Sequence, residues 1–326
     1  MITGRDVAER AGTSTAVVSY VFNNGPRNVS PATRQRVLDA AAELNYRPNV
    51  VAKALSAGRT ASIGLIVPDI ANSYFGELAR AIEDAALDRD NLLLIGDSAM
   101  NAEQERLHMA SFVDRRVDAV ILVSLLDEPD ISLFQQAGLP VVVLHPIDET
   151  KNVSSLTIDY EKAAHSATAH LLAHGYPSIG LLNGPGDSAG SRQHLRGFTQ
   201  AMEEAGRPVT HVRSSSISRA DAAETALAWL RESEHPRALY ATTDEQAFGV
   251  LYAAYECGLS VPGDLAVVGF DGTAHSGFAV PPLATVKQPV AAIADRAMTL
   301  LVDLGGEETV HELFDFEFVP RASCGC

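Results

Sequence analysis

The chain has 326 residues, enough for two or three compact units. Of these residues 46% are hydrophobic and 20% are charged, a composition typical of an ordinary folded protein. No apolar run reaches the roughly 18 residues of a membrane span, and the first residues lack the basic and apolar segments of a secretory signal. We therefore expect a cytoplasmic protein that has no membrane partner.

Charge is distributed unevenly along the chain. The formal net charge is −16, but residues 1–59 hold eight Lys or Arg and four Asp or Glu, a balance of +4. The remainder holds 17 basic and 37 acidic residues, a balance of −20. A small basic segment on an acidic body is the asymmetry expected when only that segment contacts DNA phosphates.

Three short helices are predicted at the N-terminus. Thr3 and Asp6 can cap a first helix over residues 5–11, Ser14 a second that ends near residue 22, and Ser30 a third that starts with Pro31. Their periodicity predicts a shared core of Val7, Ala8, Ala11, Val18, Val21, Val37, Leu38, Ala41 and Leu44. Two helices joined by a short Gly-containing turn form a helix-turn-helix, although length alone also allows a generic three-helix bundle.

The motif detail decides between these alternatives. Nearly sixty residues closely resemble the headpiece of the LacI/GalR repressor family, in the run DVAERAGTSTAVVSYVFN…VSPATRQRVLDAAAELNYRPNVVAKALSAGRT. The resemblance implies that the second helix enters the major groove of DNA, with Thr15, Ala16 and Tyr20 at the base-reading positions. Many members have Arg in place of Tyr20, so the operator bases cannot be named. Further DNA contacts are implied for Thr3, Ser14, Ser19, Asn23, Arg27, Ser30 and Thr33.

Residues 49–60 correspond to the family's hinge. In the family this segment forms a helix only on DNA, and two such helices pair in the minor groove. Leu55 occupies the position of an apolar wedge between base pairs, and Asn49, Ala52 and Lys53 complete the implied contacts. A simple linker with Leu55 buried against the core is the alternative.

From residue 63 onward, apolar β-rich segments alternate with amphipathic helices. Strands are predicted at 63–68, 92–97, 119–124, 141–145, 155–159, 179–183, 209–213, 238–242 and 265–270, and a last one within HELFDFEFVPRAS. Helices are predicted at 74–89, 103–116, 160–174, 192–205 and 245–258. This alternation predicts an α/β fold with parallel sheets covered on both faces, split into two halves near residue 158.

The family resemblance implies a two-lobed, periplasmic-binding-protein-like (type I) sensor behind an all-α headpiece. The headpiece would span residues 1–48 and the sensor 61–326. The N-terminal lobe would contain residues 61–157 and 288–316, and the C-terminal lobe 158–287 and 317–326, so that the chain crosses three times. A small-molecule effector would bind between the lobes, beyond the carboxyl ends of the strands.

Family motifs place candidate effector contacts. PDIANSYFGEL supplies Asn72, Tyr74 and Phe75, whose aromatic rings suit a sugar ring or a base, unless they only pack in the core. In GLLNGPGDSAGSRQHLRGF, His194 stands where the family has a ligand-clamping Arg, and Arg192 is close by; a solvated helix face is the alternative. Three further candidates follow predicted strands. Thr243 replaces an Asn of the family, Asp159 ends the first strand of the second lobe, and Asp271 lies in VVGFDGT. The alternative for Asp271 is that it only caps the following turn.

The sequence indicates no cofactor and no metal site. The helical pairs His170/His174 and His165/His170 are interpreted as exposed positions, and Cys257, Cys324 and Cys326 as reduced thiols, the last two in a frayed tail.

Together these features predict a sequence-specific transcriptional regulator, a repressor, that binds a pseudo-palindromic double-stranded DNA operator as a homodimer. Its affinity would be controlled by a sugar or a nucleoside-like or purine-like effector, acting as inducer or corepressor. The residues after the last predicted strand leave no room for a tetramerising heptad tail. An enzyme is the first alternative, but P-loop, dinucleotide and nucleophile-elbow motifs are lacking. The second alternative is a transport-associated binding protein, which the basic headpiece makes less favourable.

Overall fold

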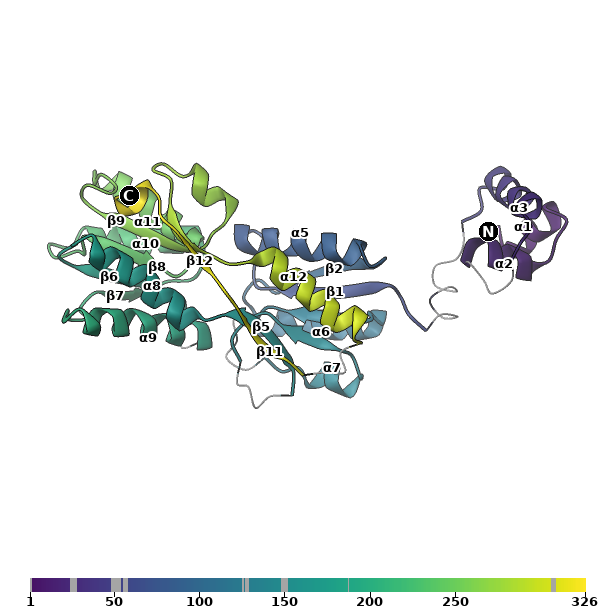
Figure 1. Ribbon diagram of the computed structural model, residues 1–326, viewed down its shortest axis with the longest axis horizontal. Coiled ribbons are helices and arrows are strands. Elements are labelled where there is room, and N and C mark those ends of the chain that lie inside the picture. Colours follow the sequence, from purple (N-terminus) through teal and green to yellow (C-terminus); the bar gives the residue numbers. More distant parts are fainter. Residues whose placement is uncertain are drawn as a thin grey trace. The chain divides into compact units, whose positions relative to one another are not determined.

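The computed structural model describes residues 2–23, 28–47, 54, 58–124, 126, 129–147, 152–186, 188–305 and 309–326. The chain divides into two compact units, Met1–Ala61 and Ser62–Cys326, which we call the headpiece and the sensor. Both are shown in Figure 1. In the described part of the chain, no helix is both long enough and apolar enough to cross a membrane.

The headpiece consists of α1 (Gly4–Arg10), α2 (Thr15–Asn23) and α3 (Pro31–Glu43). The predicted caps are present: Asp6 accepts a hydrogen bond from the Thr3 N–H (2.7 Å), and Ser30 accepts one from the Thr33 N–H (3.2 Å). The helices share a core of Val7, Ala8, Ala11, Val18, Val21, Val37, Ala40 and Ala41. The prediction for Leu38 was wrong, since its side chain is 39% exposed and Ala40 takes the inward position.

The sensor contains two six-stranded sheets, one in each of two lobes (Figure 1). The N-terminal lobe has the strand order β11-β5-β4-β3-β1-β2, and all of its strands are parallel. These strands are β1 (Ser62–Val67), β2 (Leu92–Asp97), β3 (Ala119–Leu122), β4 (Val141–Val143), β5 (Ser154–Ile158) and β11 (His311–Phe314).

The C-terminal lobe has the order β12-β10-β9-β8-β6-β7, in which only the pairing of β12 with β10 is antiparallel. Its strands are β6 (Ile179–Asn183), β7 (Val212–Ser214), β8 (Ala238–Ala241), β9 (Ala266–Asp271), β10 (Ala284–Lys287) and β12 (Glu317–Val319). The predicted α/β class with parallel sheets is confirmed, and the strand at 284–287 is an addition to the predicted set.

Helices cover both faces of each sheet, which explains the nearly continuous apolar strands. In the N-terminal lobe, one face is covered by α5 (Ser73–Leu87), α12 (Val290–Met298) and a π-helical turn, η2 (Thr299–Asp303), and the other by α6 (Ala102–Arg115) and α7 (Ser132–Gln136). In the C-terminal lobe, one face is covered by α8 (Tyr160–Ala173) and α9 (Ala189–Glu204), and the other by α10 (Arg219–Leu230) and α11 (Asp244–Glu256). Two short 3₁₀ turns, η1 (Ala274–Phe278) and η3 (Ala322–Cys324), complete the lobe.

The chain passes between the lobes three times: after β5, after β10, and between β11 and β12. The last passage corrects the prediction of a single strand in HELFDFEFVPRAS. That segment breaks after Phe314, because its first half pairs with β5 and its second half with β10, in a different sheet. Asp315 disfavours a strand, but apolar and acidic residues alternate across the break from Phe314 to Phe318, a pattern that predicts a continuous strand.

Candidate functional site

A cavity lies between the lobes, beyond the carboxyl ends of their strands, where ligands bind in open α/β sheets. It encloses about 810 Å³ when the space open to solvent is counted. Its wall comes from the ends of β3 and β4 in the N-terminal lobe and of β6, β8 and β9 in the C-terminal lobe, with the first turns of α5, α8 and α9. Six predicted contacts line it: Asn72, Tyr74, Phe75, His194, Thr243 and Asp271.

Aromatic rings form much of this wall. Tyr74 and Phe75, in the first turn of α5, meet edge to face with their centroids 5.3 Å apart. Across the cavity, Tyr160 at the start of α8 meets Phe270 at the end of β9 in the same way, also at 5.3 Å. Tyr74 and Phe75 are also members of the N-terminal lobe's core, so the packing and cavity-lining interpretations both hold. Such rings offer apolar faces to a flat ligand.

His194 is buried and lies within the aromatic group. Its ring is 5.1 Å from that of Tyr160 and 4.7 Å from that of Phe270, and its Nδ1 is hydrogen-bonded to the Tyr240 hydroxyl (2.8 Å). Burial lowers the pKa of His194 to about 3, so the ring is neutral. The position that carries a cationic guanidinium in the family therefore offers a neutral ring here, and the alternative of a solvated helix face does not apply to it.

Asp271 ends β9 with an unusual backbone. Its φ is +114°, a left-handed value that costs a side-chain-bearing residue on the order of 1–3 kcal/mol and clusters at functional sites. Its Oδ1 accepts a hydrogen bond from Gln288 Nε2 (3.0 Å), and Gln288 Oε1 accepts one from the Tyr74 hydroxyl (3.2 Å). Burial and the nearby Asp244 raise the pKa of Asp271 well above its usual value, so its carboxyl can donate as well as accept.

Sequence reasoning missed His145, which lines the same cavity from the segment after β4. Its Nδ1 accepts a hydrogen bond from the Ser124 N–H (3.3 Å), and burial lowers its pKa to about 4. The neutral ring then carries its proton on Nε2, and this buried atom has no partner among the described residues. A buried donor without a partner requires an explanation, and a ligand acceptor would provide one. The sequence does contain a signal for His145, because this polar residue follows closely on an apolar strand, in the run VVVLHP of residues 141–146.

Three of the predicted contacts are the N-caps of helices. Asn72 caps α5 by accepting from the Tyr74 N–H (3.0 Å), and Thr243 caps α11 by accepting from the Gln246 N–H (3.0 Å), and both still line the cavity. Asp159 caps α8 by accepting from the Lys162 N–H (2.9 Å) and is not part of the cavity wall. Arg192, in α9, is half-buried and is not part of it either.

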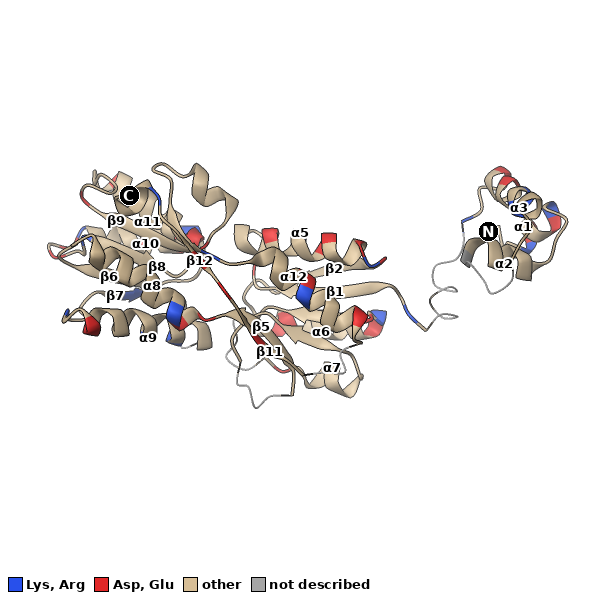
Figure 2. Cartoon of the chain, in the orientation of Figure 1, with Lys and Arg blue, Asp and Glu red and all other residues tan. Residues whose placement is uncertain are grey.

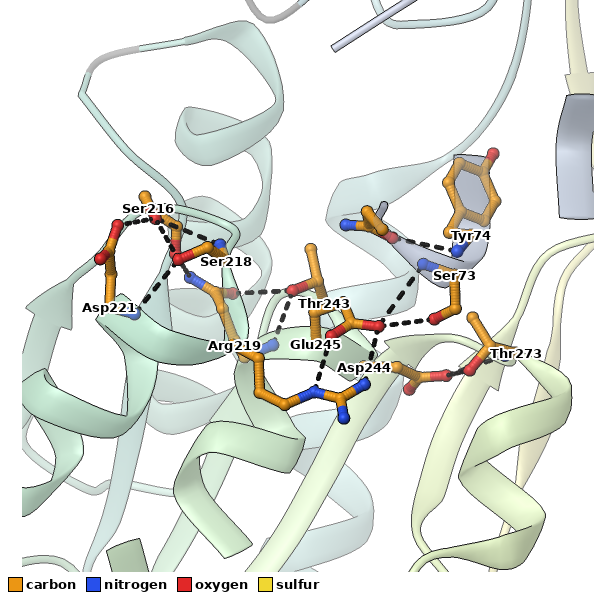
Figure 3. A network of polar contacts seen from close by, with 12 residues as sticks. Ser73, Tyr74, Ser216, Ser218, Arg219, Asp221, Thr243, Asp244, Glu245 and Thr273 are labelled. Atoms are coloured by element: carbon orange, nitrogen blue, oxygen red, sulfur yellow. Dashed lines mark hydrogen bonds and ion pairs between the residues drawn. The ribbon is translucent and has the colours of Figure 1, made fainter. Parts of the chain in front are cut away.

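A polar network joins the lobes directly at the edge of the cavity (Figure 3). Glu245, in the first turn of α11, accepts hydrogen bonds from the Ser73 hydroxyl of the other lobe (2.7 Å) and from Arg219 (2.9 Å). Burial alone would raise the pKa of Glu245, but the bonds from Arg219 and Ser73 lower it below its usual value. A second bond between the lobes runs from the Ala274 N–H to Glu77 (2.8 Å). The lobe arrangement therefore depends on a few charge-assisted contacts.

In the headpiece, α2 turns one side to the core and the other to solvent. Val18 and Val21 are buried, whereas Thr15, Ala16 and Ser19 are exposed and Tyr20 is half-buried. Of the other predicted DNA contacts, Thr3, Ser14 and Ser30 are exposed at helix starts, and Thr33 is half-buried. Arg27, Asn49, Ala52, Lys53, Leu55 and the side chain of Asn23 lie outside the described residues.

Charge in the headpiece and in the sensor is marked in Figure 2, which shows acidic residues on sensor helices such as α5 and α9. In the cavity wall the pattern is different. No Lys or Arg is found among its described lining residues, and its two histidines are neutral. The wall therefore offers hydrogen bonds and ring faces but no cation.

Comparison with known proteins agrees with both units. Residues 3–49 match the model of the lacI family of bacterial regulatory proteins, and residues 168–324 match the periplasmic binding protein-like domain. The catabolite control protein A of Priestia megaterium is 36% identical over 313 residues, 95% of this chain and 94% of that protein. The solved structures that cover 99% of this chain include two with bound ligands. The lac repressor dimer bound to operator and the anti-inducer ONPF is 27% identical, with a TM-score of 0.88 over 99% of its chain. The cellobiose complex of the transcriptional regulator CelR is 28% identical, with a TM-score of 0.74 over 100% of its chain.

The 36% identity to catabolite control protein A extends over 95% of this chain, and both units match family models, so the family of the chain is established. The relatives are transcriptional regulators and not enzymes. The chain belongs to the LacI family of bacterial regulatory proteins and is a DNA-binding transcriptional regulator with a ligand-binding sensor.

Proposed function

We propose that the chain is a cytoplasmic repressor whose operator affinity is controlled by an uncharged sugar or nucleoside-like molecule bound in the cavity between the lobes. The lining carries this proposal, because it combines aromatic faces with neutral hydrogen-bonding groups and lacks a cation. A phosphorylated or carboxylate ligand would lose its hydration there without gaining a counter-charge. One neighbouring structure contains the anti-inducer ONPF and another the sugar cellobiose, and the second ligand supports the same class.

Each lining group has a role in this proposal. The rings of Tyr74, Phe75 and Tyr160 flank the ligand and exclude water from its faces. Asp271 accepts from, or donates to, a ligand hydroxyl or ring nitrogen, and the Nε2–H of His145 donates to a ligand oxygen. Asp159 and Arg192 have no place in this set, since neither lines the cavity.

The headpiece, residues 1–48, would bind DNA through the exposed side of α2. Thr15, Ala16 and Tyr20 read base edges, while Ser14, Ser19, Ser30, Thr33 and Thr3 contact phosphates from helix ends. Residues 49–60 correspond in sequence to the family's hinge, and Leu55 to its minor-groove wedge; most of this segment lies outside the described residues. The operator is pseudo-palindromic because a symmetric dimer presents two equal headpieces.

Two exposed apolar patches support a homodimer. The β2 patch lies in and beside the edge strand of the N-terminal sheet and consists of Leu87, Leu92, Ile95, Met100 and Leu107, which are 43–64% exposed. The α11 patch consists of Tyr252, Tyr255, Phe278 and Val280, which are 53–92% exposed. Exposed apolar residues of this kind are typical of interfaces, and the neighbouring lac repressor structure is that of a dimer. Tyr255→Glu combined with Leu92→Asp should yield a monomer in sedimentation experiments.

An effector screen tests the sensor. Thermal shifts of the full chain are recorded with neutral sugars, nucleosides, purine bases and, as a contrast, sugar phosphates. We expect a hit among the uncharged compounds. Asp271→Ala should lower its affinity about tenfold or more, the value of one or two buried hydrogen bonds, while Arg192→Ala should bind normally. Preference for sugar phosphates, or an unchanged affinity in Asp271→Ala, would refute the proposed site.

Measurements of operator binding test the proposed role of the headpiece. The full chain should shift pseudo-palindromic DNA selected from a random pool, with affinity falling steeply as salt rises. The effector found in the screen should change that affinity, and the direction of the change distinguishes inducer from corepressor. Equal affinity for all sequences at moderate salt would refute the regulator's proposed specificity.

A further inference from the structure

Four potential metal ligands meet where the C-terminal segment lies against the end of α8. They are His170 and His174, one helical turn apart, and Cys324 and Cys326, and we call them the C-terminal cluster. One ligand atom from each residue lies within 4.8 Å of all the others. The sequence-based interpretation of both cysteines as frayed is therefore wrong for Cys324, whose side chain is completely buried, and His170 is half-buried instead of exposed.

Four of the six distances between ligand atoms in the cluster are close to those between the corners of a small tetrahedron, and the other two are within 4.8 Å. The two His Nε2 atoms are 3.2 Å apart, and Cys326 Sγ is 3.5 Å from His170 Nε2 and 3.3 Å from His174 Nε2. Cys324 Sγ is 3.3 Å from His170 Nε2. Zn–N bonds of about 2.05 Å and Zn–S bonds of about 2.3 Å in tetrahedral geometry place nitrogens about 3.3 Å apart, and nitrogen and sulfur about 3.6 Å apart. The ligand atoms thus already lie near coordination distances.

The surrounding structure holds these ligands in place. Ser323 is buried, accepts a hydrogen bond from the Ala284 N–H (2.8 Å) and donates one to the Val267 carbonyl (2.6 Å), which fixes the segment on sheet strands β9 and β10. Tyr176 donates to the Cys324 carbonyl (2.9 Å). Gly325 has a φ of +96° and turns the chain so that both thiols face the same helix. The ring of His170 packs on Phe318, with centroids 4.3 Å apart. A prearranged site loses little entropy when it binds an ion.

From this geometry we propose that the C-terminal cluster binds one Zn²⁺ ion, with two imidazoles and two thiolates as ligands. Four N and S ligands in a closed tetrahedron select zinc over magnesium or calcium, which require oxygen ligands. Since no position is left for water, the site is structural and not catalytic. Zinc would tie the last residues of the chain to α8, the helix whose first residue, Tyr160, lines the cavity.

The test uses the full chain purified in a non-thiol reductant, without chelators or metal-affinity resin. Elemental analysis should find one zinc per chain. Chelation should lower the thermal midpoint of the sensor, and Zn²⁺ should restore it. Co²⁺ added to the stripped protein should give the intense visible bands of tetrahedral coordination and the near-ultraviolet charge-transfer bands of thiolate ligands.

Variants identify the ligands. Cys326→Ser and His174→Ala alter exposed side chains, so the fold should be preserved, and each should weaken zinc binding at least tenfold in a chelator competition. Matched controls are Cys257→Ser, the third cysteine, and His165→Ala, on the same helix but paired with Glu204 (2.8 Å); both should retain the metal. A zinc content far below one per chain, an octahedral Co²⁺ spectrum, equal loss in the controls, or a Cys324–Cys326 disulfide in the native protein would overturn the proposal.

Discussion

The packing of α8 against α9 depends on one glycine, and Gly197→Ala tests it. A Cβ atom at this position would lie 2.0 Å from the carbonyl oxygen of Glu161 and 2.9 Å from the backbone nitrogen of His165, both in α8. Real Cβ atoms essentially never approach other atoms within 3.0 Å, so the two helices must separate by at least about 1 Å. The obstacle is backbone, which cannot turn aside as a side chain can.

The expected loss follows from two opposing terms. Overpacking of a close-packed interface costs about 1–3 kcal/mol or more, and this contact is at the severe end of that range. Alanine gains back up to about 1 kcal/mol relative to glycine in a helix. We expect a net loss of about 2 kcal/mol in the free energy of unfolding, which corresponds to a thermal midpoint about 4–8 °C lower for a domain of this size. Separation of the helices would also move Tyr160 away from His194, so effector affinity should fall as well.

Circular dichroism melts and urea titrations of the full chain measure the change. Gly76→Ala is the matched control: this residue also lies inside a helix, α5, but the nearest atom to its new Cβ is 4.0 Å away. The same substitution should therefore stabilise the protein there, by about 0.5–1 kcal/mol. If Gly197→Ala is as stable as the parent chain, or if both variants shift in the same direction, close backbone contact between α8 and α9 does not limit stability.

Three further predictions concern the cavity and its edge. His194 has a pKa lowered from 6.5 to about 3, so the unfolded chain binds more protons than the folded one below pH 6.5, and stability is lost on acidification. His194→Gln should make this fall shallower by about 1.4 kcal/mol per pH unit between pH 6.5 and 4.5 in urea titrations; an unchanged slope would mean that the ring is not buried. Ser73→Ala removes the 2.7 Å bond to Glu245 and should weaken effector binding roughly fivefold to tenfold in calorimetry, whereas unchanged binding would show that this contact does not set the lobe arrangement. His145→Phe removes the unpartnered Nε2–H and should weaken binding of an oxygen-bearing effector; because it also removes the acceptor of the Ser124 N–H, the thermal midpoint should fall as well, and an unchanged effector affinity would show that Nε2 does not bind the ligand.

Local patterns predicted most of the fold. Capping residues such as Ser30 and continuous apolar strands are local signals, and the helices and strands that they predict are present. The failures have physical causes. Leu38 fits the helical period but stands at the edge of the buried face, where the three-helix arrangement decides which side is covered. The break after Phe314 is set by the two sheets that receive its halves, whereas the alternating pattern of the segment predicts a continuous strand.

The residues of the candidate site were harder to predict from the sequence than the fold was. A polar residue between a strand and a helix is placed both to cap the helix and to face a cleft, and sequence does not say which role it takes. Asn72 and Thr243 do both, whereas Asp159 only caps. The C-terminal cluster is hidden more deeply, because His170 and Cys324 are 154 positions apart. Spacing rules detect ligands close in sequence, and only the fold brings these two together.

The first turn of α5 links the cavity to the lobe arrangement. Asn72 lines the cavity, Ser73 binds Glu245 of the other lobe, and the Tyr74 hydroxyl binds Gln288, which in turn binds Asp271. Because these three residues are consecutive in one rigid turn, a ligand that moves Tyr74 must also strain or relieve the bond from Ser73. One charge-assisted hydrogen bond is worth about 1.5–3 kcal/mol, similar to the 1–3 kcal/mol of typical allosteric coupling. We therefore expect this helical turn to couple occupancy of the cavity to the contact between the lobes.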